Sequence, residues 1–188
     1  MLGLSGLKRL LEGEAELTPG LTDDEFQDVA EKFGFDFNED HRAFLALTLP
    51  IGERWPDWRD GETEDLRARL CWPIDSLLFD VREGAFWPTP WGARPADSEE
   101  AVWVAAVALS EVPRLVPVYG HRYAVAAPAP NGSPVFSAYQ SDVIYYGKDL
   151  DDYLNREFGS RSHQTPPAGC IKVRFWSSLV EDCWEDDI

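Results

Sequence analysis

The residues that could perform chemistry are few in this sequence and lie in no familiar catalytic pattern. The 188-residue chain has three histidines and three cysteines, and none of its serines lies in the Gly-x-Ser-x-Gly turn that exposes a hydrolase nucleophile. A metal site would need His163, Cys170 and Cys183 together, whereas zinc ligands normally come in pairs two to four residues apart. No glycine-rich phosphate loop is present. We therefore expect no catalytic residue, no cofactor and no metal site.

Two other polar groupings have a structural and a chemical interpretation. The acidic run 149–152 resembles paired carboxylates, but it begins an expected helix, where the helix dipole favours acids. His121, Arg122 and Asp142 would form a hydrolytic or ligand-binding site if the fold brought them together in a deep polar pocket. This enzyme remains the minor alternative.

Charge and composition restrict the class of protein further. Apolar residues make up 44% of the chain, with eight tryptophans, which is typical of one folded domain rather than a disordered chain. There are 34 acidic and 17 basic residues, for a net charge of -17. Such a surface repels nucleic acids and anionic membranes and attracts a basic protein. Solubility alone would be another reason for the charge.

Cysteine usage and the start of the chain indicate the compartment. Three cysteines without paired spacing favour buried thiols in a reducing environment. Lys8 and Arg9 interrupt the apolar start, unlike the charged beginning and continuous apolar run of a signal peptide. No segment approaches the roughly 20 apolar residues that span a bilayer. We expect a cytoplasmic protein without membrane contact.

Four strands are predicted within residues 115–147, where β-branched and aromatic residues alternate between turn signals. Gly120-His121 and Gln140-Ser141 are predicted to form two-residue hairpin turns, and a longer loop with an Asn-Gly pair separates the central strands. This pattern is an up-and-down meander. Its period of two predicts one buried face, covered by the remaining chain.

Helix signals precede and follow the meander. Thr22 and Glu25 form a capping-box pattern before a helix, and Asn38 is the next N-cap candidate. Asp97 precedes an almost wholly apolar helix over residues 101–109, which we expect to be buried.

Pro73 is expected to open the first turn of a helical segment over residues 74–81. That segment follows a separate solvated segment over 62–70, and residues 51–58 are predicted to be irregular or a short strand. His41 lies beside an apolar helical stripe and is interpreted as a packed or surface histidine.

Several segments resemble one known family. These are PRLVPVYGHRY, SPVFSAYQSDVIYYGKDLDDYL and FNEDHRAFLALTLPIG, which are similar to the SUKH superfamily, named partly after the fungal Smi/Knr cell-wall assembly regulator. The resemblance implies an α+β domain over residues 20–182, with a mainly antiparallel sheet of about six strands packed by helices. A helix and connector would form residues 1–19, and an acidic tail would form residues 183–188.

The same resemblance implies a function without catalysis. Bacterial members are immunity proteins that bind and neutralise toxins, many of them nucleases, whereas the fungal relatives suggest a regulatory scaffold with endogenous partners. The tryptophans of the loop GAFWPTPWGARP would either cover the sheet rigidly or anchor a partner. Tyr145 and Tyr146 are expected on opposite sides of the sheet. The candidate partner-binding residues are Trp87, Trp91, Tyr139, Asp142, Tyr145, Glu181, Asp182, Glu185 and Asp186.

Overall fold

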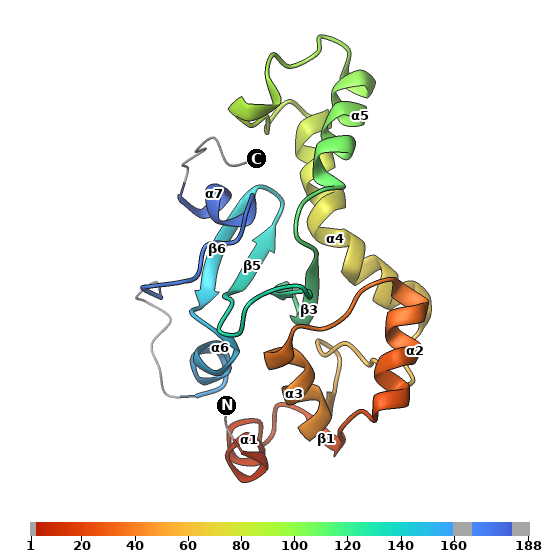
Figure 1. Ribbon diagram of the computed structural model, residues 1–188, viewed down its shortest axis with the longest axis vertical. Coiled ribbons are helices and arrows are strands. Elements are labelled where there is room, and N and C mark those ends of the chain that lie inside the picture. The colour runs from red at the N-terminus through yellow and green to blue at the C-terminus, as the bar shows by residue number, and fades with distance from the viewer. Residues whose placement is uncertain (1–2, 160–166, 182–188) are drawn as a thin grey trace.

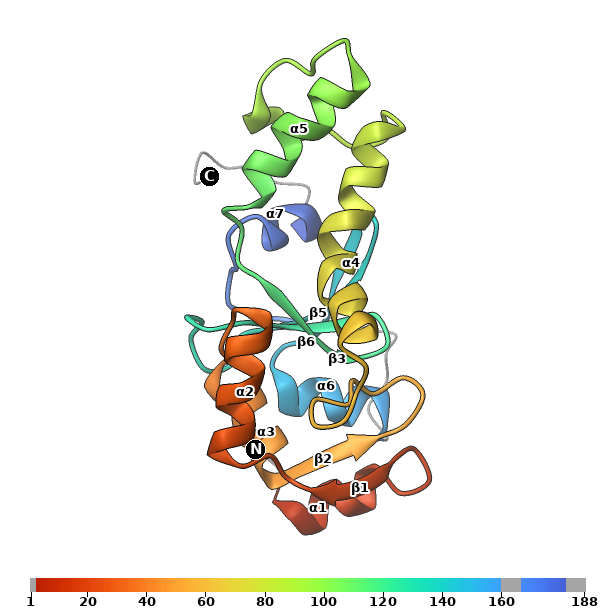
Figure 2. The same ribbon diagram turned by 90° about the vertical axis from the view of Figure 1, so that its right-hand side faces the viewer.

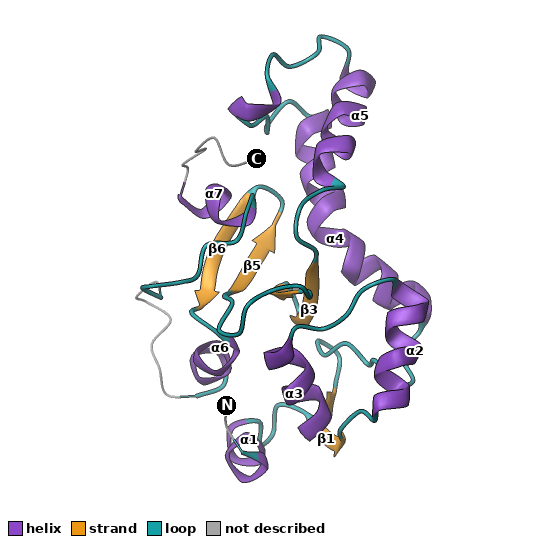
Figure 3. Cartoon of the chain, in the orientation of Figure 1, coloured by secondary structure: helices purple, strands orange, loops and turns teal. Residues whose placement is uncertain are grey.

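The computed structural model describes residues 3–159 and 167–181, which form helices and two antiparallel sheets (Figures 1 and 3). The helices are α1 (Leu4–Leu10), α2 (Asp23–Phe33), α3 (Glu39–Leu47), α4 (Thr63–Arg82), α5 (Ser98–Leu109), α6 (Leu150–Glu157) and α7 (Trp176–Glu181). The strands are β1 (Glu16–Pro19), β2 (Thr48–Ile51), β3 (Leu115–Tyr119), β4 (Arg122–Val125), β5 (Val135–Tyr139) and β6 (Asp142–Gly147). Within these ranges, no helix combines the length and apolarity needed to cross a bilayer.

The predicted meander is confirmed. Strands β3 to β6 pair in chain order, each antiparallel to the next. Tyr119 pairs with Arg122 and Tyr139 pairs with Asp142, so both two-residue turns lie where the sequence places them. Gly120 has a φ of 54°, the positive value that such a turn requires and that glycine adopts without steric cost.

The expectation of about six strands in one sheet is wrong, because β1 and β2 form a separate two-stranded sheet. Glu16 pairs with Ile51, and the Thr18 hydroxyl donates to the carbonyl of Leu49 at 2.9 Å. The segment suggested as a connector therefore contains a strand. Helix α6 lies between the two sheets (Figure 2), so the short strands belong to a different layer from the meander.

The meander is buried on both faces rather than on one. Tyr123 and Phe136 belong to a core cluster with Leu77 of α4 and Trp176 of α7. Ala124, on the opposite face, belongs to the larger cluster formed with α1, α2, α3 and α6. Figure 2 shows the corresponding layers, with α4, α5 and α7 on one side of the sheet and the N-terminal helices and α6 on the other. The side chains on both faces of the meander are therefore largely apolar.

Helix α4 is a single helix of 20 residues that contains Pro73, which corrects the prediction of two segments divided there. Proline has no N–H, so the carbonyl of Arg69 loses its normal partner four residues later. The hydroxyl of Tyr123 donates to this carbonyl at 3.3 Å. Burial raises the pKa of Tyr123 above its ordinary value, which keeps the hydroxyl protonated as a donor. A side chain from β4 thus satisfies the group that proline leaves unpaired.

Helix α5 is not buried all round, contrary to the expectation from its composition. Ala101, Ala105 and Leu109 face the core, whereas Trp103 is 67% exposed and Val107 is 52% exposed. The helix packs mainly against α4 in an antiparallel hairpin that projects from the sheet (Figure 1). One neighbouring helix can cover only one face of another, so the outer face of α5 stays open.

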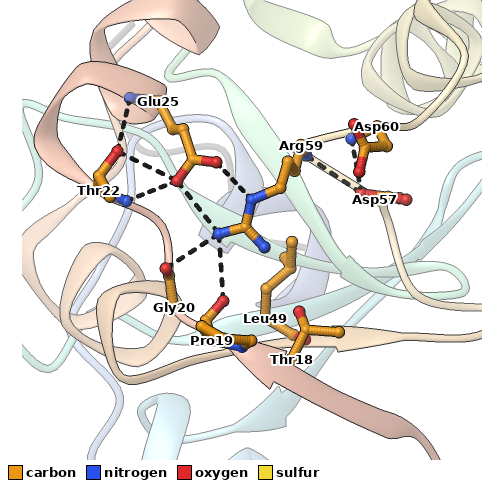
Figure 4. A network of polar contacts seen from close by, with 9 residues as sticks. All are labelled: Thr18, Pro19, Gly20, Thr22, Glu25, Leu49, Asp57, Arg59 and Asp60. Atoms are coloured by element: carbon orange, nitrogen blue, oxygen red, sulfur yellow. Dashed lines mark hydrogen bonds and ion pairs between the residues drawn. The ribbon is translucent and has the colours of Figure 1, made fainter.

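The predicted capping box is present and is extended by an arginine from a distant loop (Figure 4). The Glu25 carboxylate accepts from the Thr22 amide at 2.8 Å and from the Arg59 guanidinium. Arg59 also donates to the carbonyls of Pro19 and Gly20 at 3.2 and 3.0 Å. The Arg59 hydrogen bond and the Thr22 amide lower the pKa of Glu25 to about 2. This network ties the end of β1 to the start of α2.

The described cysteines are free thiols, but they are not both buried as expected. Cys71 is exposed on α4, and Cys170 is half-buried. Cys71 is next to the exposed Trp72, on the solvent-exposed part of α4. Cys183 lies outside the described residues.

Candidate functional site

Three exposed aromatic side chains form a surface that we call the aromatic groove. Trp72 and Phe79 of α4 are 41% and 51% exposed, and Tyr139 at the end of β5 is 55% exposed. The rings of Trp72 and Tyr139 are in contact, with centroids 5.9 Å apart and planes tilted by 51°. Large aromatic side chains are usually buried, and an exposed cluster of them commonly marks an interaction surface.

The continuity of α4 places two of these residues together. Trp72 and Phe79 are seven residues apart, so they lie on the same face of a helix. Leu70 and Leu77 have the same spacing and are buried on the opposite side. A helix broken at Pro73 would not keep the two aromatic residues in line.

A buried carboxylate fixes Tyr139 beside α4. The Asp80 carboxylate, on a residue only 6% exposed, accepts hydrogen bonds from the Ser141 amide at 2.9 Å and from its hydroxyl at 2.7 Å. These bonds hold the β5–β6 turn against the helix. Gln140 has a φ of 56° in this turn, a left-handed conformation uncommon for a residue with a side chain. The tertiary contact therefore positions a turn that is not intrinsically favoured.

Replacing Asp80 with alanine is expected to destabilise the protein by about 2 kcal/mol, because the Ser141 amide loses its partner in a partly buried site. Hydrogen exchange of the Ser141 amide should become faster. Denaturant unfolding and exchange NMR measure the two effects. Asp75→Ala, an exposed aspartate of the same helix, is the control and should change stability by less than about 0.5 kcal/mol. Equal effects of the two substitutions would contradict the role given to Asp80.

Two hollows flank the contact between Trp72 and Tyr139. The first hollow has a volume of about 310 Å³, and its lining residues are Trp72, Asp75, Ser76, Phe79, Tyr139 and Gln140. The second hollow has a volume of about 340 Å³, and its lining residues are Ala68, Arg69, Trp72, Gly120, His121, Tyr123 and Tyr139. Each is large enough for a side chain of a partner, and the two share Trp72 and Tyr139 as lining residues.

The charges beside the first hollow favour a cationic partner. Asp75 lines the first hollow, and Asp142 is exposed where β6 begins. Arg69, a cation at the second hollow, is paired with Asp65 at 2.7 Å. Burial, followed by the nearby Arg122 and Arg54, lowers the pKa of His121, so its imidazole is uncharged at neutral pH.

The predicted loop tryptophans pack as a cover rather than standing free. Trp87 and Trp91 are half-buried, and their rings meet edge to face with centroids 5.3 Å apart. Trp91 stacks on Phe175 at 6.3 Å with an interplanar angle of 5°. The Trp87 indole N–H donates to the carbonyl of Gly92 at 2.8 Å. These contacts attach the loop to the core cluster that contains Phe175.

The remaining predicted contact residues that the structure describes lie on β5, β6 and α7 rather than on the tryptophan loop. Tyr145 is half-buried, and its hydroxyl donates to Glu181 at 3.2 Å, while Lys172 also pairs with Glu181. Tyr145 and Tyr146 pack into opposite core clusters, as predicted. Tyr139 belongs to the aromatic groove, and Asp142 pairs with it across the turn. The predicted contact residues outside the described chain are Asp182, Glu185 and Asp186.

The histidine, arginine and aspartate of the enzyme alternative have different surroundings. His121 lines the second hollow, whereas the Arg122 guanidinium donates to Ser137 at 3.0 Å and is paired with Glu157. Asp142 is exposed, and no interaction between described residues joins it to His121 or Arg122. The described ranges also hold no group of three His, Cys, Asp or Glu side chains arranged for a metal. His163 lies outside them.

Sequence reasoning missed Trp72 and Phe79. Dividing the helix at Pro73 left Trp72 outside both expected segments and hid the face that it shares with Phe79. A continuous helical pattern over residues 63–82 would have placed both opposite Leu70 and Leu77. Comparison of the chain with protein-family models, curated proteins and solved structures found no match.

Proposed function

We propose that this chain is a non-enzymatic, acidic protein-binding module of the cytoplasm, and that it neutralises a basic toxin, of the nuclease type, by direct binding. The aromatic groove is its contact surface. A nuclease carries basic residues for its phosphate-bearing substrate, so an acidic binder over that surface would block substrate access. The resemblance to the SUKH superfamily motivates the choice of a toxin as the partner.

The observation that carries the proposal is the exposure of Trp72, Phe79 and Tyr139 beside two neighbouring hollows that share Trp72 and Tyr139. Tryptophan and tyrosine are enriched among the few residues that supply most of the binding energy at protein interfaces. The helix and the hydrogen-bonded turn hold these rings in place before a partner arrives. Such preorganisation reduces the entropy lost on association.

The net charge supports a basic partner in particular. With 34 acidic and 17 basic residues, the chain attracts a cationic surface over distances up to about a Debye length, roughly 8 Å at physiological salt. Complementary charge chiefly accelerates association and excludes acidic competitors. The rings would then supply the affinity within the contact.

Substituting Trp72 and Tyr139 together by alanine is expected to weaken binding of the basic partner about 100-fold, since each truncated ring removes roughly a factor of ten. The partner is first isolated from native lysate by affinity capture with elution in a salt gradient. Binding of the purified partner is then measured by calorimetry, and inhibition of its nuclease activity is measured beside it. Trp103→Ala, an exposed tryptophan of α5, is the matched control and should bind as the wild type does.

Three results would contradict the proposal. Unchanged affinity of the folded double variant would exclude the groove as the contact surface. A partner without toxic activity would exclude neutralisation. Recovery of several weakly bound endogenous proteins would favour the regulatory scaffold, the alternative that the fungal members of the superfamily suggest.

A further inference from the structure

The first hollow combines three aromatic rings with a carboxylate. Its walls are Trp72 and Phe79 from α4 and Tyr139 from β5, and Asp75 lies between the two helical rings in sequence. Trp72, Asp75 and Phe79 follow spacings of three and four residues, which places them on one helix face. The faces of aromatic rings carry negative potential and attract cations. The hollow therefore has the chemistry of a cation site.

Asp75 is available to such a cation. Among the residues that the structure describes, no ion pair or hydrogen bond engages its carboxylate, whereas Asp80 in the next turn is occupied by Ser141. Ser76 and Gln140, two residues with polar side chains, also line the hollow, and the Ser76 hydroxyl donates to the carbonyl of Pro73 at 3.4 Å. A guanidinium with five N–H donors would find acceptors here as well as ring faces.

The protein already uses this chemistry at two other places, one buried at Arg122 and one exposed at Arg54. The guanidinium of Arg122 lies 3.8 Å from the centroid of the Tyr146 ring and 3.7 Å from the Glu157 carboxylate. Arg54 likewise lies 4.3 Å from the centroid of the Tyr119 ring. In the described part of the chain, no arginine or lysine lies over the three rings of the first hollow. The first hollow thus resembles these two arginine sites, but no arginine of the described chain occupies it.

We propose that the first hollow is a subsite for one arginine side chain of the basic partner. The guanidinium lies against the rings of Trp72 and Tyr139 and directs its N–H groups toward the Asp75 carboxylate. Arginine suits this site better than lysine, because a planar guanidinium stacks on rings and pairs with a carboxylate through two hydrogen bonds. The identity of the occupant as a partner's side chain rests on the proposed function. The hollow itself is a property of this chain.

The test is an NMR titration of the full chain with N-acetyl-arginine amide at low ionic strength. The indole N–H of Trp72, assigned from a Trp72→Phe variant, and the Gln140 amide report on the hollow. We expect saturable shifts of these two signals with a dissociation constant on the order of 1 to 10 mM, as suits a single charged side chain. The neutral citrulline analogue should bind at least about tenfold more weakly, and the lysine analogue about threefold more weakly.

Two variants separate the subsite from general attraction to an acidic surface. Asp75→Asn should weaken binding of the arginine analogue about fivefold, whereas Glu99→Gln removes a charge from α5 and should have little effect. Tyr139→Ala should abolish saturation. Equal binding of citrulline, equal binding of lysine, or equal effects of Asp75→Asn and Glu99→Gln would each overturn the proposal. Shifts spread over the acidic surface without saturation would also overturn it.

The result is distinguishable from that of the proposed function. If the arginine analogue saturates the hollow but the alanine double variant still binds the captured partner, the subsite stands and the proposed contact surface fails. If the partner requires the groove but the analogue produces no shift at Trp72, the proposed contact surface stands and the arginine subsite fails.

Discussion

Replacing Glu157 with glutamine will destabilise the protein by about 3 kcal/mol, because it leaves the buried charge of Arg122 without its counterion. The two side chains are 10% and 13% exposed, and their closest N and O atoms are 3.7 Å apart. Arg122 Nε and Glu157 Oε2 find no hydrogen-bond partner among the residues that the structure describes. The attraction between the two charges therefore compensates for their removal from water, together with the Ser137 hydrogen bond and the Tyr146 ring on the arginine. Denaturant unfolding monitored by fluorescence measures the change.

The control for this prediction is the same chemical change at an exposed ion pair. Arg82 and Glu99 lie 3.4 Å apart with side chains 51% and 76% exposed, so Glu99→Gln should cost less than about 0.5 kcal/mol. The double substitution Arg122→Met with Glu157→Leu should recover much of the stability lost in Glu157→Gln, because apolar side chains need no counterion. A Glu157→Gln variant as stable as Glu99→Gln would show that the buried pair contributes nothing.

Lowering the pH from 7 to 5 will destabilise the protein by about 2 kcal/mol through His41 alone. His41 is 2% exposed, and burial lowers its pKa from the ordinary value of 6.5 to about 3. Between these values the unfolded chain binds a proton at this residue and the folded protein does not. The stabilising contribution of the neutral imidazole is thus complete above pH 6.5 and is lost progressively as the pH falls toward 3. Unfolding free energies measured between pH 6.5 and pH 3 give the slope of stability against pH.

A His41→Leu variant should lose most of this slope, whatever its stability at pH 7. His121 also has a lowered pKa and contributes in the same direction, but it is partly exposed, so His121→Gln should retain the greater part of the slope. His41 packs edge to face against Phe37 with ring centroids 5.0 Å apart, which is the apolar setting that disfavours the imidazolium. An unchanged slope in His41→Leu would mean that the folded protein admits a proton at this site.

Local features of the fold were predictable because they depend on residues close together in the chain. The capping box of Thr22 and Glu25 and the caps at Asn38 and Asp97 each join groups three residues apart. The two-residue turns of the meander depend on short spacings between strands in the same way. The place of His41 beside an apolar stripe left a packed and a surface histidine both open, and the folded chain decides for burial, with 2% of the residue exposed.

The aromatic groove depends instead on contacts between residues far apart in the chain. Tyr123 lies 54 residues from Arg69, yet its hydroxyl completes the helix that Pro73 would otherwise interrupt. Asp80 lies 61 residues from Ser141, yet its carboxylate brings Tyr139 to α4. No local pattern contains these pairs, so the sequence predicted two segments divided at Pro73 and did not place the turn beside α4.

Composition and spacing thus specify an acidic α+β protein with capped helices and a four-stranded meander, since propensity, period and charge are properties of short segments. The division of the strands into two sheets, the continuity of α4 and the meeting of Trp72 with Tyr139 arise only in the folded chain. Each is set by a hydrogen bond or packing contact whose partners are adjacent in space and distant in sequence, and such partners are matched only when the layers assemble.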